Sequence, residues 1–120
     1  MTASNPHGLT QLRDSLRQFA AERDWDQFHS PKNLAMALAV EAAELLERFQ
    51  WTTEDDSKRL PPAELVRVRE EMADVLNYLV RLADKLDVDL LAAAREKVVL
   101  NAQKYPVEKS RGNSKKYSDL

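Results

Sequence analysis

The sequence contains no cysteine and only two glycines among its 120 residues. Without cysteine, the chain forms no disulfide, iron–sulfur cluster, thiolate zinc site or cysteine nucleophile. The two glycines, Gly8 and Gly112, leave no room between them for a glycine-rich loop, which excludes P-loop and dinucleotide-binding folds. Any phosphate-binding site in this chain must therefore use side chains or a metal ion.

A large charge excess and long apolar runs are also missing. The 18 basic and 20 acidic side chains give a formal net charge of −2, which argues against a surface that binds nucleic acid or membranes by charge alone. No apolar run approaches the roughly 18–20 residues of a membrane span, and the N-terminus lacks the apolar core of a signal peptide. We therefore expect a cytoplasmic protein with neither a nucleic-acid nor a membrane partner.

Helical periodicity runs through most of the chain between residues 9 and 105, and no segment alternates strictly enough to predict a strand. The fold class predicted is all-α, with four helices. Ser30 and Pro31 mark the start of the second helix, and Asp87 or Asp89 is suited to cap the fourth. The four helices are expected over about residues 9–24, 31–50, 61–86 and 89–105.

The helices are expected to form one domain over residues 9–105. Residues 1–8 are predicted to be a flexible N-terminus. The segment from residue 106 onward has four basic residues against two acidic ones and no apolar period. It is predicted to be an irregular, basic C-terminal tail.

The most informative stretch is LAMALAVEAAELL, residues 34–46, which is apolar except for Glu41 and Glu44. These glutamates continue the apolar stripe of their helix instead of lying opposite it. Glu71 and Asp74 form a second acidic pair with the same three-residue spacing on the next long helix. Both pairs are therefore expected at partly buried positions.

Facing carboxylates need compensation, because like charges about 5 Å apart repel by about 3 kcal/mol at an effective dielectric of about 20. A cation or shared protons would supply it. Clustered carboxylate oxygens suit Mg²⁺, with Mn²⁺ as a substitute, whereas an ordinary acidic pair is a solvated surface. The apolar setting favours the metal, with Glu41, Glu44, Glu71 and Asp74 as ligands and catalytic groups, and so favours phosphoryl chemistry.

Basic and aromatic residues are consistent with a nucleotide substrate. Lys97, Asn101 and Lys104 share one helix face, which is either a polyphosphate contact or a solvated lysine face. The aromatic residues Trp25, Phe28, Trp51 and Tyr78 are candidates for stacking on a base or for packing in the core. His29 beside them is either a loop residue or a phosphate donor.

Several segments resemble the MazG-like superfamily of all-α nucleoside triphosphate pyrophosphohydrolases. The paired acidic signature Glu41-x-x-Glu44 and Glu71-x-x-Asp74 is shared with that superfamily. The dCTP pyrophosphatase branch is the most similar, through segments spread over nearly the whole chain. These segments are FAAERDWDQFH (19–29), PKNL (31–34), FQW (49–51), EEMADVLNYLV (70–80) and NAQKYP (101–106).

The resemblance implies a four-helix MazG-like bundle subunit that assembles as a homodimer or homotetramer. It also implies Mg²⁺-dependent hydrolysis of dCTP, or a modified dCTP, to the monophosphate and pyrophosphate, with Glu44 or Glu41 as the base for the attacking water. Some eukaryotic members carry a histidine near the position of Leu16, which this chain lacks. The substrate-binding residues implied are Trp25, Asp26, Gln27, Phe28, His29, Trp51, Tyr78, Lys97, Asn101, Lys104 and Tyr105.

Three other hypotheses remain open at this point. The first is a member of the same superfamily with another nucleotide substrate, such as its phosphoribosyl-ATP branch. The second is a helical interaction module whose acidic pairs contact a partner. The third and weakest is nucleic-acid binding through the tail.

Overall fold

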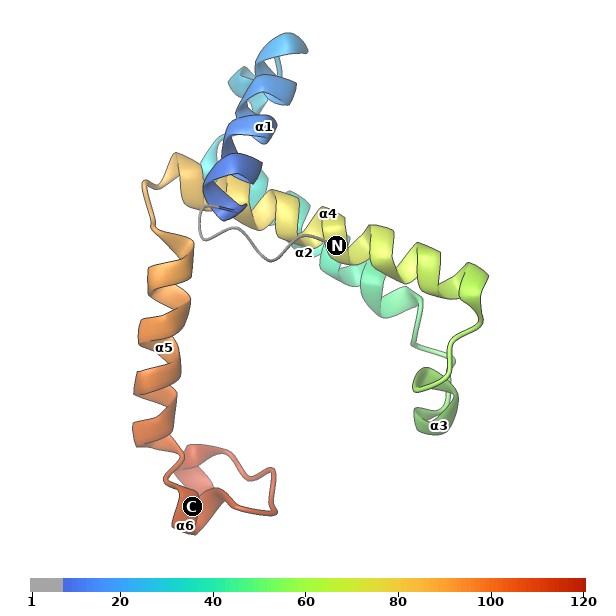
Figure 1. Ribbon diagram of the computed structural model, residues 1–120, viewed down its shortest axis with the longest axis vertical. Helices are drawn as coiled ribbons and strands as arrows, with labels where there is room; N and C mark the ends of the chain where they lie inside the picture. Colours follow the sequence, from blue (N-terminus) through green and yellow to red (C-terminus); the bar gives the residue numbers. More distant parts are fainter. Residues whose placement is uncertain (1–7) are drawn as a thin grey trace. The chain divides into compact units, whose positions relative to one another are not determined.

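The computed structural model describes residues 8–120, which form helices joined by short turns and contain no strand (Figure 1). The all-α prediction is therefore confirmed for this part of the chain. The predicted flexible N-terminus lies outside the described residues except for Gly8, which begins the first helix. The chain divides into two compact units, Met1–Asp87 and Val88–Leu120, and each is described by itself.

Four long helices correspond to the four predicted ones, and two single-turn helices are added to them. The 3₁₀-helices η1 and η2 complete the set. The first unit contains α1 (Gly8–Glu22), η1 (Asp26–Phe28), α2 (Pro31–Glu47), α3 (Glu54–Ser57) and α4 (Pro62–Lys85). The second unit contains α5 (Leu90–Lys104), α6 (Val107–Ser110) and η2 (Tyr117–Asp119).

The helix starts follow the capping signals in the sequence. The Ser30 hydroxyl accepts a hydrogen bond from the Asn33 amide at 3.1 Å, with Pro31 in the first helical position. The Asp89 carboxylate accepts from the Ala92 amide at 3.0 Å and caps α5. Both predicted caps are confirmed. Of the two residues suited to cap α5, Asp87 and Asp89, it is Asp89 that does so.

Helix α4 is the central element of the first unit, because it packs against both α1 and α2. Figure 1 shows α2 and α4 side by side. The buried apolar residues within residues 8–120 are few: Ala20, Leu34, Val68, Val80 and Ala83. Several large apolar side chains of α4 are exposed, among them Leu65, Met72 and Leu76.

The tail after residue 105 was predicted to be irregular, but it contains α6 and η2. Pro106 has the extended conformation of an N-cap (φ −58°, ψ 143°) and starts α6. The Tyr117 ring of η2 packs edge-on to Tyr105 with centroids 6.1 Å apart, and Lys104 Nζ lies 5.0 Å from the Tyr117 centroid. Aromatic and cation–π contacts therefore order a segment that has no apolar period.

None of the helices within residues 8–120 has the length and apolar character needed to cross a membrane.

Candidate functional site

Three glutamates from two helices meet where α2 packs against α4. Glu41 and Glu44 lie one turn apart on α2, and Glu71 lies on α4. One carboxylate oxygen from each residue lies within 4.8 Å of the others. The three-residue spacing on α2 places both of its carboxylates on the face turned toward α4.

Two oxygens of this cluster are buried without any hydrogen-bond donor, namely Glu41 Oε2 and Glu71 Oε2. Burial, together with the neighbouring charge of Glu44, raises the pKa of the Glu41 carboxyl to about 7. Burial also raises the pKa of Glu71, although the positive charge of Arg48 acts in the opposite direction. The cluster therefore carries more negative charge than its protein surroundings neutralise.

This donor set fits a hard divalent cation. It consists of carboxylate oxygens alone, which are the ligands preferred by Mg²⁺ and Mn²⁺. A cation would also satisfy the two oxygens that have no partner and offset the mutual repulsion. The structure thus brings together three of the four residues predicted as metal ligands.

Asp74, the fourth predicted ligand, is not among the oxygens within 4.8 Å of one another. Its negative charge nevertheless raises the pKa of both Glu41 and Glu71. The exposed Asp74 side chain lines a cavity. Asp74 therefore lies close enough to the carboxylate cluster to affect its titration and also forms part of the cavity wall.

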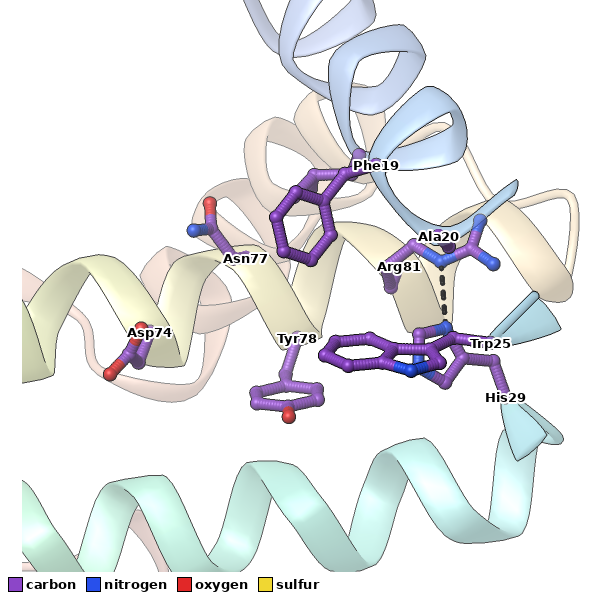
Figure 2. A pocket seen from close by; sticks show the side chains of 9 residues that line it. Phe19, Ala20, Trp25, His29, Asp74, Asn77, Tyr78 and Arg81 are labelled. Atoms are coloured by element: carbon purple, nitrogen blue, oxygen red, sulfur yellow. Dashed lines mark hydrogen bonds between the residues drawn. The ribbon is translucent and has the colours of Figure 1, made fainter. Parts of the chain in front are cut away.

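The cavity has a volume of about 250 Å³ and is lined by residues of α1, α4 and the segment around η1 (Figure 2). This is slightly below the roughly 300–1,000 Å³ that is usual for ligand pockets. It suits a single planar ring system better than a whole nucleotide. The lining residues are Leu16, Phe19, Ala20, Trp25, His29, Asp74, Asn77, Tyr78 and Arg81.

Trp25 enters this cavity because of the way α1 ends. Asp24 adopts the left-handed conformation with φ 53°. The Trp25 amide donates to the Ala20 carbonyl at 2.9 Å, and the Asp24 amide donates to the Ala21 carbonyl at 3.1 Å. This pair of hydrogen bonds is a Schellman motif, which reverses the chain and packs the residue after the turn against the last turn of the helix.

Ion pairs hold the η1 segment against α4. Asp26 accepts hydrogen bonds from Lys85 Nζ at 2.5 Å and Arg81 Nη2 at 2.8 Å, and both lower the pKa of its carboxyl. Asp84 accepts from Arg17 Nε of α1 at 2.7 Å. These contacts tie α1 and η1 to the C-terminal half of α4, so they fix the cavity wall.

Comparison with known proteins agrees with this geometry. A sequence model of the MazG-like family matches residues 36–120. The chain belongs to the MazG-like family. The resemblance seen in the acidic pairs is thereby confirmed.

Curated relatives of this MazG-like protein include dCTP pyrophosphatase 1 of Mus musculus, 49% identical over 93% of this chain and 67% of the mouse protein. The Homo sapiens protein of the same name is 44% identical over the same shares. A pyrophosphatase crystal structure from Archaeoglobus fulgidus has a TM-score of 0.73 and 40% identity, covering 88% of this chain and 99% of that one.

The cavity brings together three of the predicted substrate-binding residues, namely Trp25, His29 and Tyr78 (Figure 2). Asp26 and Gln27 instead contact other residues of the protein, since Asp26 pairs with Arg81 and Lys85 of α4 and Gln27 donates to Asp24. The other predicted residues are not among those that line the cavity. Phe28 is 59% exposed, Trp51 is 90% exposed, and Lys97, Asn101, Lys104 and Tyr105 belong to α5 and its C-cap in the second unit.

Sequence reasoning missed five cavity residues of this MazG-like chain, namely Leu16, Phe19, Ala20, Asn77 and Arg81. The ring of Phe19 lies edge-on to Trp25, with centroids 5.6 Å apart. Arg81 interrupts the otherwise apolar run from Tyr78 to Ala83. That interruption was the available signal, because a charge within an apolar run near a helix end often has buried partners.

Proposed function

We propose that this MazG-like protein hydrolyses dCTP, or a modified dCTP, to the nucleoside monophosphate and pyrophosphate. The observation that carries the proposal is the cluster of Glu41, Glu44 and Glu71, with its two unpartnered buried oxygens, connected through Asp74 to an aromatic cavity. Relatives named dCTP pyrophosphatase 1, which are 44–49% identical to this chain, support the choice of nucleotide.

In this proposal Glu41, Glu44, Glu71 and Asp74 hold magnesium. When bound, the ion neutralises phosphate oxygens and lowers the pKa of a water molecule. Glu41 or Glu44 accepts the proton of the water that attacks the α-phosphorus. The bond from that phosphorus to the bridging oxygen then breaks, and pyrophosphate leaves.

The base of the nucleotide occupies the cavity, where Trp25 and Tyr78 offer aromatic surfaces (Figure 2). Stacking on an aromatic side chain contributes about 1–3 kcal/mol per base. The remaining predicted contacts come from residues outside the cavity. These are Asp26, Gln27, Phe28 and Trp51 around the nucleotide, and Lys97, Asn101, Lys104 and Tyr105 on phosphate or sugar.

We also propose that the protein works as a homodimer or homotetramer. Large apolar side chains are exposed on both α2 and α4, including Val40 at 57%, Leu46 at 63% and Met72 at 57%. Exposed apolar surface of this kind marks association sites. Light scattering coupled to size-exclusion chromatography tests this, and a monomer at micromolar concentration would contradict it.

Incubation with each of the four dNTPs and Mg²⁺, followed by chromatographic separation of the products, tests the activity. We expect dCMP and pyrophosphate, with dCTP turned over faster than the other three substrates. Release of orthophosphate and dCDP would contradict the bond assignment. A clear preference for another nucleotide would contradict the substrate assignment and leave the carboxylate site standing.

A further inference from the structure

Arg81 is the one buried residue with a polar or charged side chain within residues 8–120, with 5% of its surface exposed. Burial of a guanidinium is unfavourable unless it is paired and hydrogen-bonded. Two of its nitrogens meet carboxylates, with Nη2 at 2.8 Å from Asp26 Oδ1 and Nη1 at 3.4 Å from Asp84 Oδ2. The third, Nε, donates to Nδ1 of His29 at 3.3 Å (Figure 2).

The contact with Nε determines the proton position on His29. An arginine side chain stays protonated in proteins, so its Nε–H is always a donor. Nδ1 of His29 must therefore be the acceptor nitrogen. The imidazole proton then lies on Nε2.

The charges around His29 also keep the ring neutral. Burial lowers the pKa of His29, the positive charges of Arg81 and Lys85 on α4 lower it further, and Asp26 of η1 opposes them. Asp84 of α4 faces the same arginine and is itself paired with Arg17 of α1. Asp26 and Asp84 are thus each paired with basic side chains. The positive charges near the imidazole ring outnumber the negative ones, which favours its neutral form.

His29 lines the cavity together with Trp25, and the two rings meet edge-on with centroids 6.4 Å apart. Most of the other wall residues are apolar or aromatic, so the few polar groups of the wall, among them the His29 ring, determine how a ligand is oriented. We propose that Arg81 is a positioning residue that holds His29 as the neutral Nε2–H tautomer, so that His29 donates to a carbonyl oxygen of a pyrimidine base. The substrate part rests on the proposed function.

A neutral donor is suited to a base carbonyl, whereas an imidazolium would favour a phosphate oxygen. A cavity of about 250 Å³ also has room for a base ring in preference to a triphosphate. Replacing His29 by leucine should therefore raise KM for dCTP about tenfold, which corresponds to the loss of one hydrogen bond, with a smaller change in kcat. His29→Gln, which restores an N–H donor, should recover part of that loss.

The tautomer itself is measured by NMR of ¹⁵N-labelled histidine. His7 is the other histidine of the chain, so the His7→Ala background reports on His29 alone. We expect a protonated Nε2 and an unprotonated Nδ1 at neutral pH, persisting to below the usual histidine pKa. In Arg81→Met we expect both tautomers and a higher titration midpoint.

The Arg81→Met change leaves each carboxylate one cation, since Asp26 keeps Lys85 and Asp84 keeps Arg17. A proton on Nδ1 in the unsubstituted protein, or an unchanged midpoint in Arg81→Met, would overturn the inference. If Arg81→Met fails to fold, the tautomer and midpoint of the unsubstituted protein still decide it. The NMR measurement needs no turnover, so its outcome is independent of whether dCTP is the substrate.

Discussion

Glu41 on α2 and Glu71 on α4 each bury one carboxylate oxygen that accepts no hydrogen bond. Both residues belong to the group whose oxygens lie within 4.8 Å of one another. Unpartnered buried carboxylate oxygens are unfavourable for folding, and their repulsion adds to that cost. The arrangement is therefore expected to bind a cation, and the first two predictions test this relationship.

The Glu71→Gln variant should lose the cation site and keep the fold. Removal of one charge lowers the repulsion in the cluster, so the metal-free variant should melt at a higher temperature than the unsubstituted protein. Addition of Mg²⁺ should raise the melting temperature of the unsubstituted protein but not that of the variant.

Glu70→Gln is the matched control, because Glu70 is the exposed neighbour of Glu71 on α4 and is not in the cluster. It should respond to Mg²⁺ as the unsubstituted protein does. Loss of a residue that only supports a metal ligand lowers activity about 10–100-fold. Glu71→Gln removes a proposed ligand itself, so it should lower activity by at least as much. An equal Mg²⁺ response in the two variants would remove the metal site.

The stability of the metal-free protein should depend on the titration of Glu41. Folding raises the pKa of this carboxyl from 4.5 to about 7, so the folded protein binds an extra proton between these values. The contribution of Glu41 to the free energy of unfolding therefore decreases as the pH rises through this interval. Urea denaturation in EDTA at a series of pH values measures it.

The Glu41→Gln variant isolates the contribution of Glu41 to that pH dependence. Its unfolding free energy should lack the part of the decrease assigned to Glu41, and the difference between the two curves should level off above about pH 7. Mg²⁺ affinity of the unsubstituted protein should change in the opposite direction, increasing as the pH rises to about 7, because cation and proton compete for the same oxygens. Parallel stability curves would contradict the raised pKa.

Trp25 should contribute to nucleotide affinity through its ring. Trp25→Ala removes an aromatic wall of the cavity. Because stacking on the base is lost, we expect the binding free energy of dCMP to become less favourable by about 1–3 kcal/mol. Trp25→Phe keeps a ring and should retain most of the affinity. Calorimetric titration with dCMP measures both, and equal losses in the two variants would argue against stacking.

Asp84 should be important for stability, because it joins α1 to α4. Its side chain is 8% exposed and pairs with both Arg17 and Arg81. Asp84→Asn leaves the buried Arg81 with one carboxylate fewer, and we expect a loss of about 3 kcal/mol in unfolding free energy. Asp14→Asn, at a position 57% exposed, should change it by less than about 0.5 kcal/mol.

The Asp84 carboxyl should make the free energy of unfolding depend on pH in the direction opposite to that expected for Glu41. The hydrogen bonds from Arg17 are the main cause that lowers the pKa of Asp84 below its ordinary value of 3.8. The stability from this ion pair is therefore complete at neutral pH and is lost as the pH falls through the lowered pKa. Equal acid sensitivity of the unsubstituted protein and Asp84→Asn would contradict this.

Local features of the chain were predictable from the sequence. Ser30 and Asp89 cap helices because a capping side chain acts on an amide three residues away. The pairing of Glu41 with Glu44 follows from helical spacing, and their apolar neighbours indicated burial. Spacing could not show which of the four carboxylates approach within 4.8 Å of one another, because this depends on how α2 and α4 pack.

The sequence by itself determined the all-α class, the positions of the long helices and the two acidic pairs, because all of these depend on residues within one or two helical turns. The tertiary structure alone decided which side chains share the cavity. Arg81 meets His29 and Asp26 across 52 and 55 positions of the chain. Contacts at such separations have no period in the sequence, since they form only when α1, η1 and α4 pack together.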